Sequence, residues 1–255
     1  MLLVIDVGNT NIVLGVFDGP KLVADWRIAT RQNKTDDEYG IQFKQLFSLA
    51  GLQSAVPSGC ILASVVPPLQ GVIERACKKY FGQAPLVVEP GIKTGMSVLY
   101  ENPREVGADR IVNAVAAYEQ WKCGLIVVDF GTATTFDLVT PKGEYLGGVI
   151  CPGIGISAEA LFMRAAKLPR IDLTAPKSAI GRNTVDSMRS GLVYGYAEMV
   201  DGLIRRLRDE LPYENKVIAT GGHAAIIAEH SQSIAAIEPR LTLYGLRIIY
   251  ELNRK

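Results

Sequence analysis

Two segments of the chain place an aspartate at the end of an apolar run, directly before a glycine-containing turn. They are Asp6-Val7-Gly8-Asn9-Thr10-Asn11 and Asp129-Phe130-Gly131-Thr132-Ala133-Thr134-Thr135. Glycine lets the backbone come close to a ligand, so that its N–H groups can point at a phosphate. Residues 9–11 add further donors, and Asp6 can hold a hydrated Mg²⁺ on the phosphates. These residue types predict two phosphate-binding turns.

A plain hairpin rich in turn-forming residues is the simpler interpretation of either turn taken alone. The threonines of the second segment also suit a half-exposed strand. The repetition of the pattern favours binding, because two turns of the same design can approach one polyphosphate from two sides.

The two turns belong to a longer internal repeat. Residues 3–28 align with residues 126–150, and Asp6 then matches Asp129. Each copy has an apolar run, a turn, a second run, another turn and a third run, which predicts three antiparallel strands in a meander. A buried strand normally ends on a neutral residue, so the repeated carboxylate predicts a cation or a phosphate-bound metal between the halves.

Helical periodicity follows each meander. In the first half we expect helices at 36–50, 68–80 and 105–122, and strands at 60–65 and 86–89. In the second half we expect helices at 157–168, 184–211, 223–230 and 239–253, and a strand at 216–220. The predicted fold is α/β, with two duplicated βββαβαβα (ribonuclease H-like) halves at 1–117 and 118–255 and a nucleotide cleft between them. This plan resembles the superfamily of sugar kinases, actin and heat-shock chaperone ATPases.

Gly107-Ala108-Asp109-Arg110 opens the helix expected next to the hinge between the halves. An aspartate in a first helical turn is commonly only a favourable charge on the helix dipole. An acceptor substrate of a kinase must lie near the hinge, however, and a carboxylate can take the proton of its hydroxyl group. Arg110 could meet an acidic substrate through forked hydrogen bonds.

Two glycine-rich turns of the second half have different interpretations. Thr220-Gly221-Gly222 could let an adenosine lie against bare backbone, although every α/β protein needs strand-to-helix turns. Residues 153–158 match a dinucleotide-binding fingerprint, with Asp172 near the expected distance. That match fails on context, because the preceding strand belongs to an antiparallel meander. The GxxxxGK[ST] motif of P-loop proteins is absent from the sequence.

The composition excludes several classes. Of 255 residues, 27 are Lys or Arg and 26 are Asp or Glu, so no excess of positive charge favours nucleic acid or an anionic membrane. Four scattered cysteines and two histidines make a zinc site or a disulfide framework improbable. The N-terminus lacks a signal-peptide pattern and no segment is apolar enough to span a membrane, so we expect a cytoplasmic protein.

The ordered set of motifs resembles type III pantothenate kinases over essentially the whole chain. The matching motifs are Asp6 to Thr10, Gly107 to Arg110, Asp129 to Thr134, Pro152-Gly153-Ile154 and Thr220 to Gly222. Members of this family use ATP to phosphorylate the primary hydroxyl of pantothenate, giving 4'-phosphopantothenate in the first step of coenzyme A biosynthesis. They are homodimers in which the partner subunit partly closes the substrate pocket.

The resemblance implies a role for each matching residue. Asp109 would be the general base, Asp129 would hold K⁺ or NH₄⁺, and Asp6 would hold Mg-ATP. ATP would contact Asp6, Val7, Gly8, Asn9, Thr10, Asn11, Ile12, Val13 and Thr132; pantothenate would contact Tyr100, Gly107, Ala108, Asp109, Arg110 and Thr184. Two rival functions are an ATPase switch without an acceptor substrate and a nucleotide-binding regulatory protein, because the Bvg accessory factor belongs to the same sequence family.

Overall fold

The computed structural model describes residues 1–254, and the chain separates into two compact units. Of the described residues, unit 1 comprises 1–96, 101–116 and 241–254, and unit 2 comprises 97–100 and 117–240. The C-terminal helix therefore belongs with the first sheet, whereas the expected halves of 1–117 and 118–255 placed it in the second. Periodicity along the chain does not reveal which sheet a helix covers.

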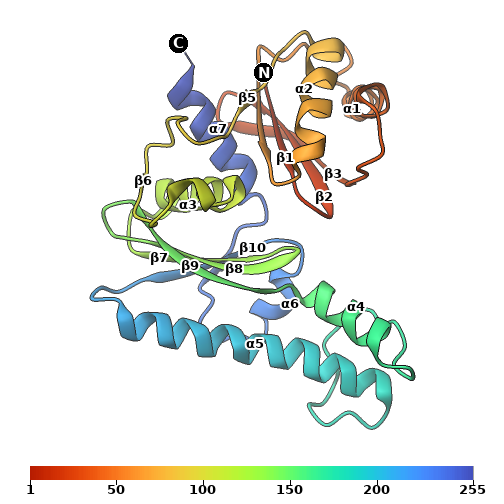
Figure 1. Ribbon diagram of the computed structural model, residues 1–255, viewed down its shortest axis with the longest axis vertical. Coiled ribbons are helices and arrows are strands. Elements are labelled where there is room, and N and C mark those ends of the chain that lie inside the picture. Colours follow the sequence, from red (N-terminus) through yellow and green to blue (C-terminus); the bar gives the residue numbers. More distant parts are fainter. Residues whose placement is uncertain (255) are drawn as a thin grey trace. The chain divides into compact units, whose positions relative to one another are not determined.

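Unit 1 contains a five-stranded sheet in the order β3-β2-β1-β4-β5 (Figure 1). Its strands are β1 (Leu2–Val7), β2 (Asn11–Asp18), β3 (Lys21–Ala29), β4 (Gly59–Ser64) and β5 (Leu86–Val87). The unit also contains α1 (Asp36–Leu49), α2 (Pro67–Phe81), a 3-10 helix (Pro103–Glu105), the first part of α3 (Ala108–Trp121) and α7 (Leu241–Asn253). The first three strands form the expected antiparallel meander, and β4 then pairs with β1 in parallel.

Unit 2 repeats this plan. Its sheet has the order β11-β10-β7-β8-β9-β6, so five of its strands have the order of unit 1. The strands are β6 (Ser97–Val98), β7 (Leu125–Phe130), β8 (Ala133–Val139), β9 (Glu144–Pro152), β10 (Lys216–Thr220) and β11 (Ala236–Ile237). The helices are α4 (Ile154–Arg164), α5 (Thr184–Glu210) and α6 (Ala224–Ala228). The predicted duplication and fold class are thereby confirmed.

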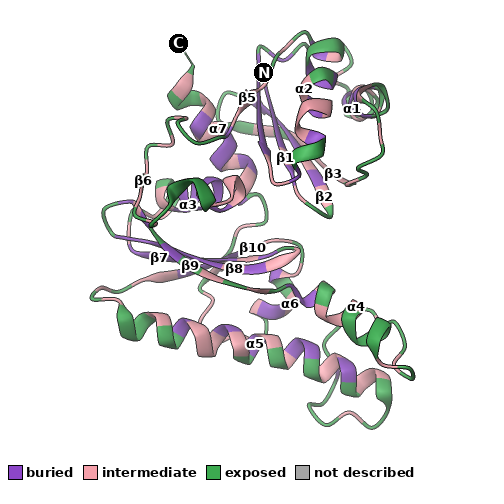
Figure 2. Cartoon of the chain, viewed as in Figure 1, coloured by how far each residue is buried: buried purple, intermediate pink, exposed green. Residues whose placement is uncertain are grey.

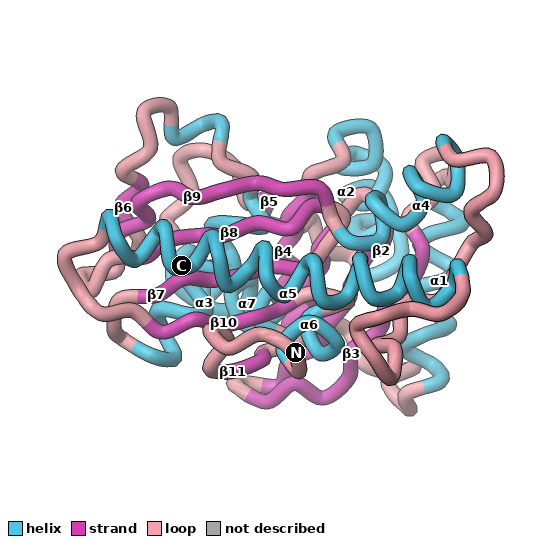
Figure 3. The backbone as a smooth tube through the Cα atoms, turned by 90° about the horizontal axis from the view of Figure 1, so that it is seen from below, coloured by secondary structure: helices cyan, strands magenta, loops and turns pink. Residues whose placement is uncertain are grey.

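The two sheets direct equivalent sets of alternating residues toward their helices, since side chains on a strand point to alternate faces. In unit 1, Leu3, Ile5 and Val7 pack against the side with α1 and α2, while α7 lies near β1 and β4 on the other side. In unit 2, a large cluster joins β7, β8 and β10 to α4, α5 and α6. Figure 2 shows the central strands of both sheets buried, and Figure 3 shows α5 extending over the strands of unit 2.

Local signals explain where several helices begin and end. Thr35 caps α1 in a reciprocal pair with Glu38, and two prolines open α2, where a missing N–H costs nothing. Gly82 ends α2 in the left-handed conformation that glycine adopts freely. Among the described residues, no helix combines the length and the apolar character that a membrane span requires.

The repeated hairpins differ by one residue in their turns. In the first, Val7 pairs with Ile12, so Gly8 to Asn11 form the turn. In the second, Phe130 pairs with Thr134, so the turn is shorter. The sequence alignment matches Asp6 with Asp129 correctly, but beyond the turn it is displaced by one residue.

Candidate active site

The first predicted phosphate turn is a tight hairpin at the carboxyl end of β1. The Gly8 N–H donates to the Asn11 carbonyl at 3.0 Å, and the Thr30 N–H donates to the Thr10 carbonyl at 2.9 Å. The Thr30 hydroxyl also donates to the Gly8 carbonyl at 2.6 Å. Thr30 lies at the end of β3 and fixes the turn from outside it. The sequence motif did not point to Thr30, because only the pairing of β2 with β3 brings it there.

Burial separates the residues of this hairpin by what they can offer a ligand. Val7 and Ile12 have no exposed surface, so they support the turn from the core of unit 1. Asn9 and Thr10 are exposed, and Asp6 is partly buried at the end of β1. The polar groups available to a phosphate are therefore in the turn itself.

The start of α3 lies next to this hairpin within unit 1. The N–H of Val65 donates to the carbonyl of Val7 at 3.0 Å. A Cβ atom on Gly107 would lie 3.8 Å from a methyl group of Val65. The structure thus brings together two of the predicted motifs, the Asp6 to Val13 hairpin and the Gly107 to Arg110 turn, at the carboxyl ends of β1 and β4. Open α/β sheets bind ligands at this edge.

Asp109 is more than a charge at the start of a helix. Its Oδ1 atom accepts the Arg110 N–H at 2.8 Å. A Cβ atom on Gly107 would lie 2.6 Å from the same oxygen, so glycine is needed beside the carboxylate. Burial raises the pKa of Asp109 above its ordinary value, despite the opposing effects of that hydrogen bond and of the Arg110 charge. An exposed helix-capping carboxylate would show no such elevation, so the environment suits a proton acceptor.

The carboxylate of Asp129 lies in a cradle of backbone in unit 2. Gly221 has a φ of +93°, and a Cβ atom there would lie 2.4 Å from Asp129 Oδ1 and 2.6 Å from the carbonyl carbon of Phe130. A Cβ atom on Gly131 would lie 3.6 Å from the same carboxylate oxygen. Gly221 therefore lets the backbone pack directly against the Asp129 carboxylate, where a larger residue would not fit.

Three turns meet around the carboxyl end of β7. The Gly153 N–H donates to the Thr132 carbonyl at 3.1 Å, and the His223 N–H donates to the Phe130 carbonyl at 3.4 Å. A Cβ atom on Gly153 would lie only 2.2 Å from the Thr132 carbonyl oxygen, so the start of α4 packs directly on the second phosphate turn. Pairing of β8 with β9 is antiparallel, which confirms that the fingerprint at residues 153–158 does not open a dinucleotide-binding unit.

Two residues predicted to bind pantothenate lie far apart in unit 2. The ring of Tyr100 follows β6 and packs 6.5 Å from the ring of Tyr145. Thr184 is exposed at the first residue of α5. Figures 1 and 3 place β6 and the start of α5 at opposite ends of the unit. One chain does not bring these two residues together within unit 2.

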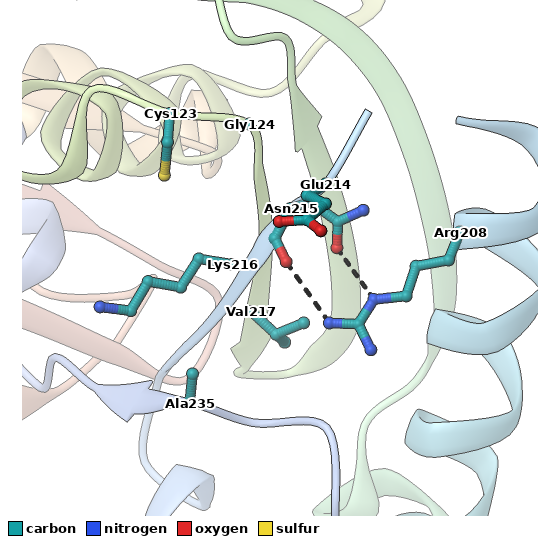
Figure 4. A pocket seen from close by; sticks show the side chains of 8 residues that line it. All are labelled: Cys123, Gly124, Arg208, Glu214, Asn215, Lys216, Val217 and Ala235. Carbon is teal, nitrogen blue, oxygen red and sulfur yellow. Dashed lines mark hydrogen bonds between the residues drawn. The ribbon is translucent and has the colours of Figure 1, made fainter. Parts of the chain in front are cut away.

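A hollow of about 320 Å³ lies at the other end of the second sheet, away from the predicted site (Figure 4). Arg208 projects into it, but its guanidinium donates to the side chain and carbonyl of Asn215 at 3.1 and 3.4 Å. The other lining residues are Cys123, Gly124, Glu214, Lys216, Val217 and Ala235, none of which is a predicted site residue. The arginine therefore stabilises the turn before β10.

Comparison with known proteins agrees with the motifs. The family model of type III pantothenate kinases matches residues 2–206. A type III pantothenate kinase from Anaeromyxobacter sp. strain Fw109-5 is 60% identical over 254 residues, and the match covers 100% of both chains.

Two solved structures have the same fold. An inorganic polyphosphate/ATP-glucomannokinase from Arthrobacter sp. strain KM has a TM-score of 0.53 at 16% identity, with 99% of each chain covered. A conserved Campylobacter jejuni protein described as a Baf family transcriptional activator has a TM-score of 0.60 at 18% identity, with 98% of each chain covered. At these identities the likeness shows the architecture alone. By the family match and the full-length identity, the chain belongs to the type III pantothenate kinase family.

Proposed function

We propose that the protein transfers the γ-phosphoryl group of ATP to the primary hydroxyl of pantothenate, which gives 4'-phosphopantothenate and begins coenzyme A biosynthesis. The observation that carries this proposal is the 60% identity to a type III pantothenate kinase over the whole length of both chains. The partly buried Asp109, whose pKa is raised, adds a suitable proton acceptor. We expect the reaction to take place in the cytoplasm.

The two hairpin turns are suited to hold the nucleotide. We assign the polyphosphate to the turn at Gly8, with the N–H groups of Asn9 to Asn11 as donors, and to Thr132, with Asp6 holding the hydrated Mg²⁺ of Mg-ATP. Bound Mg²⁺ would neutralise charge on the phosphates. Thr30 keeps the first turn in shape through its two hydrogen bonds.

Asp109 acts on the acceptor substrate. Its carboxylate orients the primary hydroxyl and accepts its proton as the bond to phosphorus forms. Arg110 is almost completely buried and lies next in the chain, where its guanidinium could bind the pantothenate carboxylate. Gly107 and Ala108 line the same turn, and Tyr100 supplies a ring against the substrate.

An assay of ADP release with and without pantothenate separates this function from its rivals. A kinase releases ADP only when pantothenate is present, and 4'-phosphopantothenate appears in equal amount. An ATPase switch would release ADP at the same rate in both reactions. A purely regulatory protein would bind ATP without turnover in either reaction.

We predict that activity depends on a monovalent cation held by Asp129. The close approach of the backbone at Gly221 to Asp129 Oδ1 supports this prediction, because carboxylate and backbone carbonyl oxygens are the ligands that hard cations prefer. We expect low rates in sodium-only buffer and recovery when potassium or ammonium is titrated in. Asp129→Asn should lose this response, and potassium should raise the melting temperature of the wild type but not of the variant. Equal rates in sodium and potassium would refute the prediction.

We also propose that two subunits complete each pantothenate pocket. The α5 helix has 27 residues and is therefore about 40 Å long. Beyond its C-terminal end, Tyr213 packs on Gly124, and burial followed by the charge of Glu144 raises its pKa. Glu144 precedes Tyr145, which contacts Tyr100. Thr184 thus lies at the far end of α5 from Tyr100, and a pocket that contains both needs Thr184 of a second copy.

Mixed dimers test this arrangement. Asp109→Asn and Thr184→Ala should each impair the homodimer. If pockets are shared, a heterodimer of the two variants contains one intact pocket, and random pairing should recover about a quarter of the wild-type sites. A mixture of Asp109→Asn with Asp109→Ala is the matched control and should recover nothing. Absence of recovery in the first mixture, with subunit exchange verified by mass spectrometry, would place both residues in one subunit's pocket.

A further inference from the structure

A buried carboxylate on β8 has no role in the site described so far. Asp137 has no exposed surface. Its counterpart in unit 1 is Gly15. Asp137 pairs with Val127 and Gly15 pairs with Val4, and these two valines occupy equivalent positions in the repeat. The duplicated fold therefore does not require an acid at this position. Burying a carboxylate is costly unless it is well hydrogen-bonded. We therefore expect Asp137 to have a specific role in unit 2.

Each oxygen of Asp137 accepts a hydrogen bond from a different side chain. The hydroxyl of Tyr145 donates to Oδ1 at 2.7 Å, and the hydroxyl of Thr135 donates to Oδ2 at 3.1 Å. Tyr145 is also completely buried. A hydrogen bond between two completely buried groups is costly to leave unmade, so this pair holds the Tyr145 ring in place.

Tyr145 in turn holds the segment that carries Tyr100. The Leu99 N–H donates to the Tyr145 carbonyl at 2.8 Å, and β6 pairs with β9 at Val98 and Tyr145. The rings of Tyr100 and Tyr145 are tilted by 53° at a centroid distance of 6.5 Å.

Gly147 also lies against the Tyr100 ring. Its φ is +136°, and a Cβ atom there would lie 3.6 Å from two carbons of that ring. Tyr100 therefore lies beside both the bare backbone at Gly147 and the fixed Tyr145 ring.

The hydrogen-bonded group of Thr135, Asp137 and Tyr145 lies next to Asp129, the residue proposed to bind the cation. Thr135 lies directly opposite Asp129 in the pairing of β7 with β8, so their side chains lie on the same face of the sheet. The order Asp129, Thr135, Asp137, Tyr145 and Tyr100 thus forms a continuous row within unit 2.

We propose that Asp137 and Tyr145 form a buried positioning pair that fixes the ring of Tyr100 for pantothenate binding. The inference rests on the proposed function, because it takes Tyr100 as a pantothenate-binding residue. Neither Asp137 nor Tyr145 touches the substrate in this proposal. Asp137 holds the Tyr145 hydroxyl, and Tyr145 holds Tyr100.

The test is Tyr145→Phe, which removes one hydroxyl and keeps the ring. We expect the KM for pantothenate to rise about three- to tenfold, because the freed ring no longer fixes Tyr100, while the KM for ATP stays within about twofold. A general loss of structure would move both constants together. Tyr213→Phe is the matched control, since its hydroxyl is buried without a hydrogen-bond partner, and both KM values should stay at the wild-type level.

A double-mutant cycle shows whether the effect passes through Tyr100. Tyr145→Phe should have little further effect on the KM for pantothenate when Tyr100 is already alanine. Independent, additive effects would overturn the proposal, and so would a folded Tyr145→Phe variant with an unchanged KM. If Tyr145→Phe does not fold, Asp137→Asn serves instead, with the same selective rise expected. A wild-type protein that does not phosphorylate pantothenate would refute the proposed function itself, which is a different result.

Discussion

Replacement of Asp109 by asparagine is expected to lower kcat by about 10²–10⁴ while ATP affinity changes only a few-fold. The amide keeps the shape of the side chain but cannot take the proton of the pantothenate hydroxyl. Single-turnover phosphorylation measures the loss, and calorimetry with ATP measures the affinity. A variant with near-normal turnover, or one that loses ATP binding as well, would return Asp109 to the role of a favourable charge on the helix dipole.

The raised pKa of Asp109 leads to two further expectations, one for the pH dependence of activity and one for the stability of the fold. The base must be ionised, so kcat/KM should fall on the acid side with a midpoint above 3.8, the ordinary value. Because the pKa of Asp109 is higher in the folded than in the unfolded protein, protonation of this carboxylate favours folding. This contribution to stability is fully present below the unfolded pKa and is lost as the pH rises through the folded pKa. Above the folded pKa, the ionised and largely buried carboxylate therefore lowers the stability of the fold. Asp109→Asn should melt at the same temperature as the wild type or higher.

Helices and strands with strong local signals could be predicted from the sequence to within a few residues. The α1 and α2 helices begin at a capping box and at prolines, and β10 has the expected bounds of Lys216–Thr220. In contrast, α4 begins at Ile154 instead of Ser157, because Gly153 and Gly155 suggested a turn where the helix had already started. The two-residue strands β6 and β11 depend on pairing partners and leave no periodic signal.

Some residues of the candidate site could likewise be predicted from the sequence, and others could not. The aspartates and glycines of the hairpins could be found because the repeat displays them twice. Thr30 and Asp137 could not, because their importance comes from contacts with residues on neighbouring strands. The position of α7 in unit 1 also depends on long-range packing, where Gly245 lets the helix backbone approach the carbonyl of Val112.

Gly221→Ala is expected to be the most disruptive single-methyl change in unit 2. Its φ of +93° is a conformation that alanine rarely adopts. The new Cβ would also lie 2.4 Å from Asp129 Oδ1 and 2.6 Å from the backbone of Phe130, which belongs to the central strand β7 and cannot move easily. Strain and overpacking each cost about 1–3 kcal/mol, so unfolding should become easier by about 3 kcal/mol.

The matched control is Gly82→Ala, which shares the left-handed backbone but has open space around the added methyl group. Its cost should be limited to the conformational strain of about 1 kcal/mol. Thermal unfolding should show a fall of roughly 6–12 °C for Gly221→Ala and a few degrees for Gly82→Ala. Because the methyl group would displace the Asp129 carboxylate, only Gly221→Ala should also raise the potassium concentration needed for half-maximal activity. Equal melting temperatures and equal potassium requirements in the two variants would show that the backbone around Asp129 is not the tight cradle that Gly221 maintains.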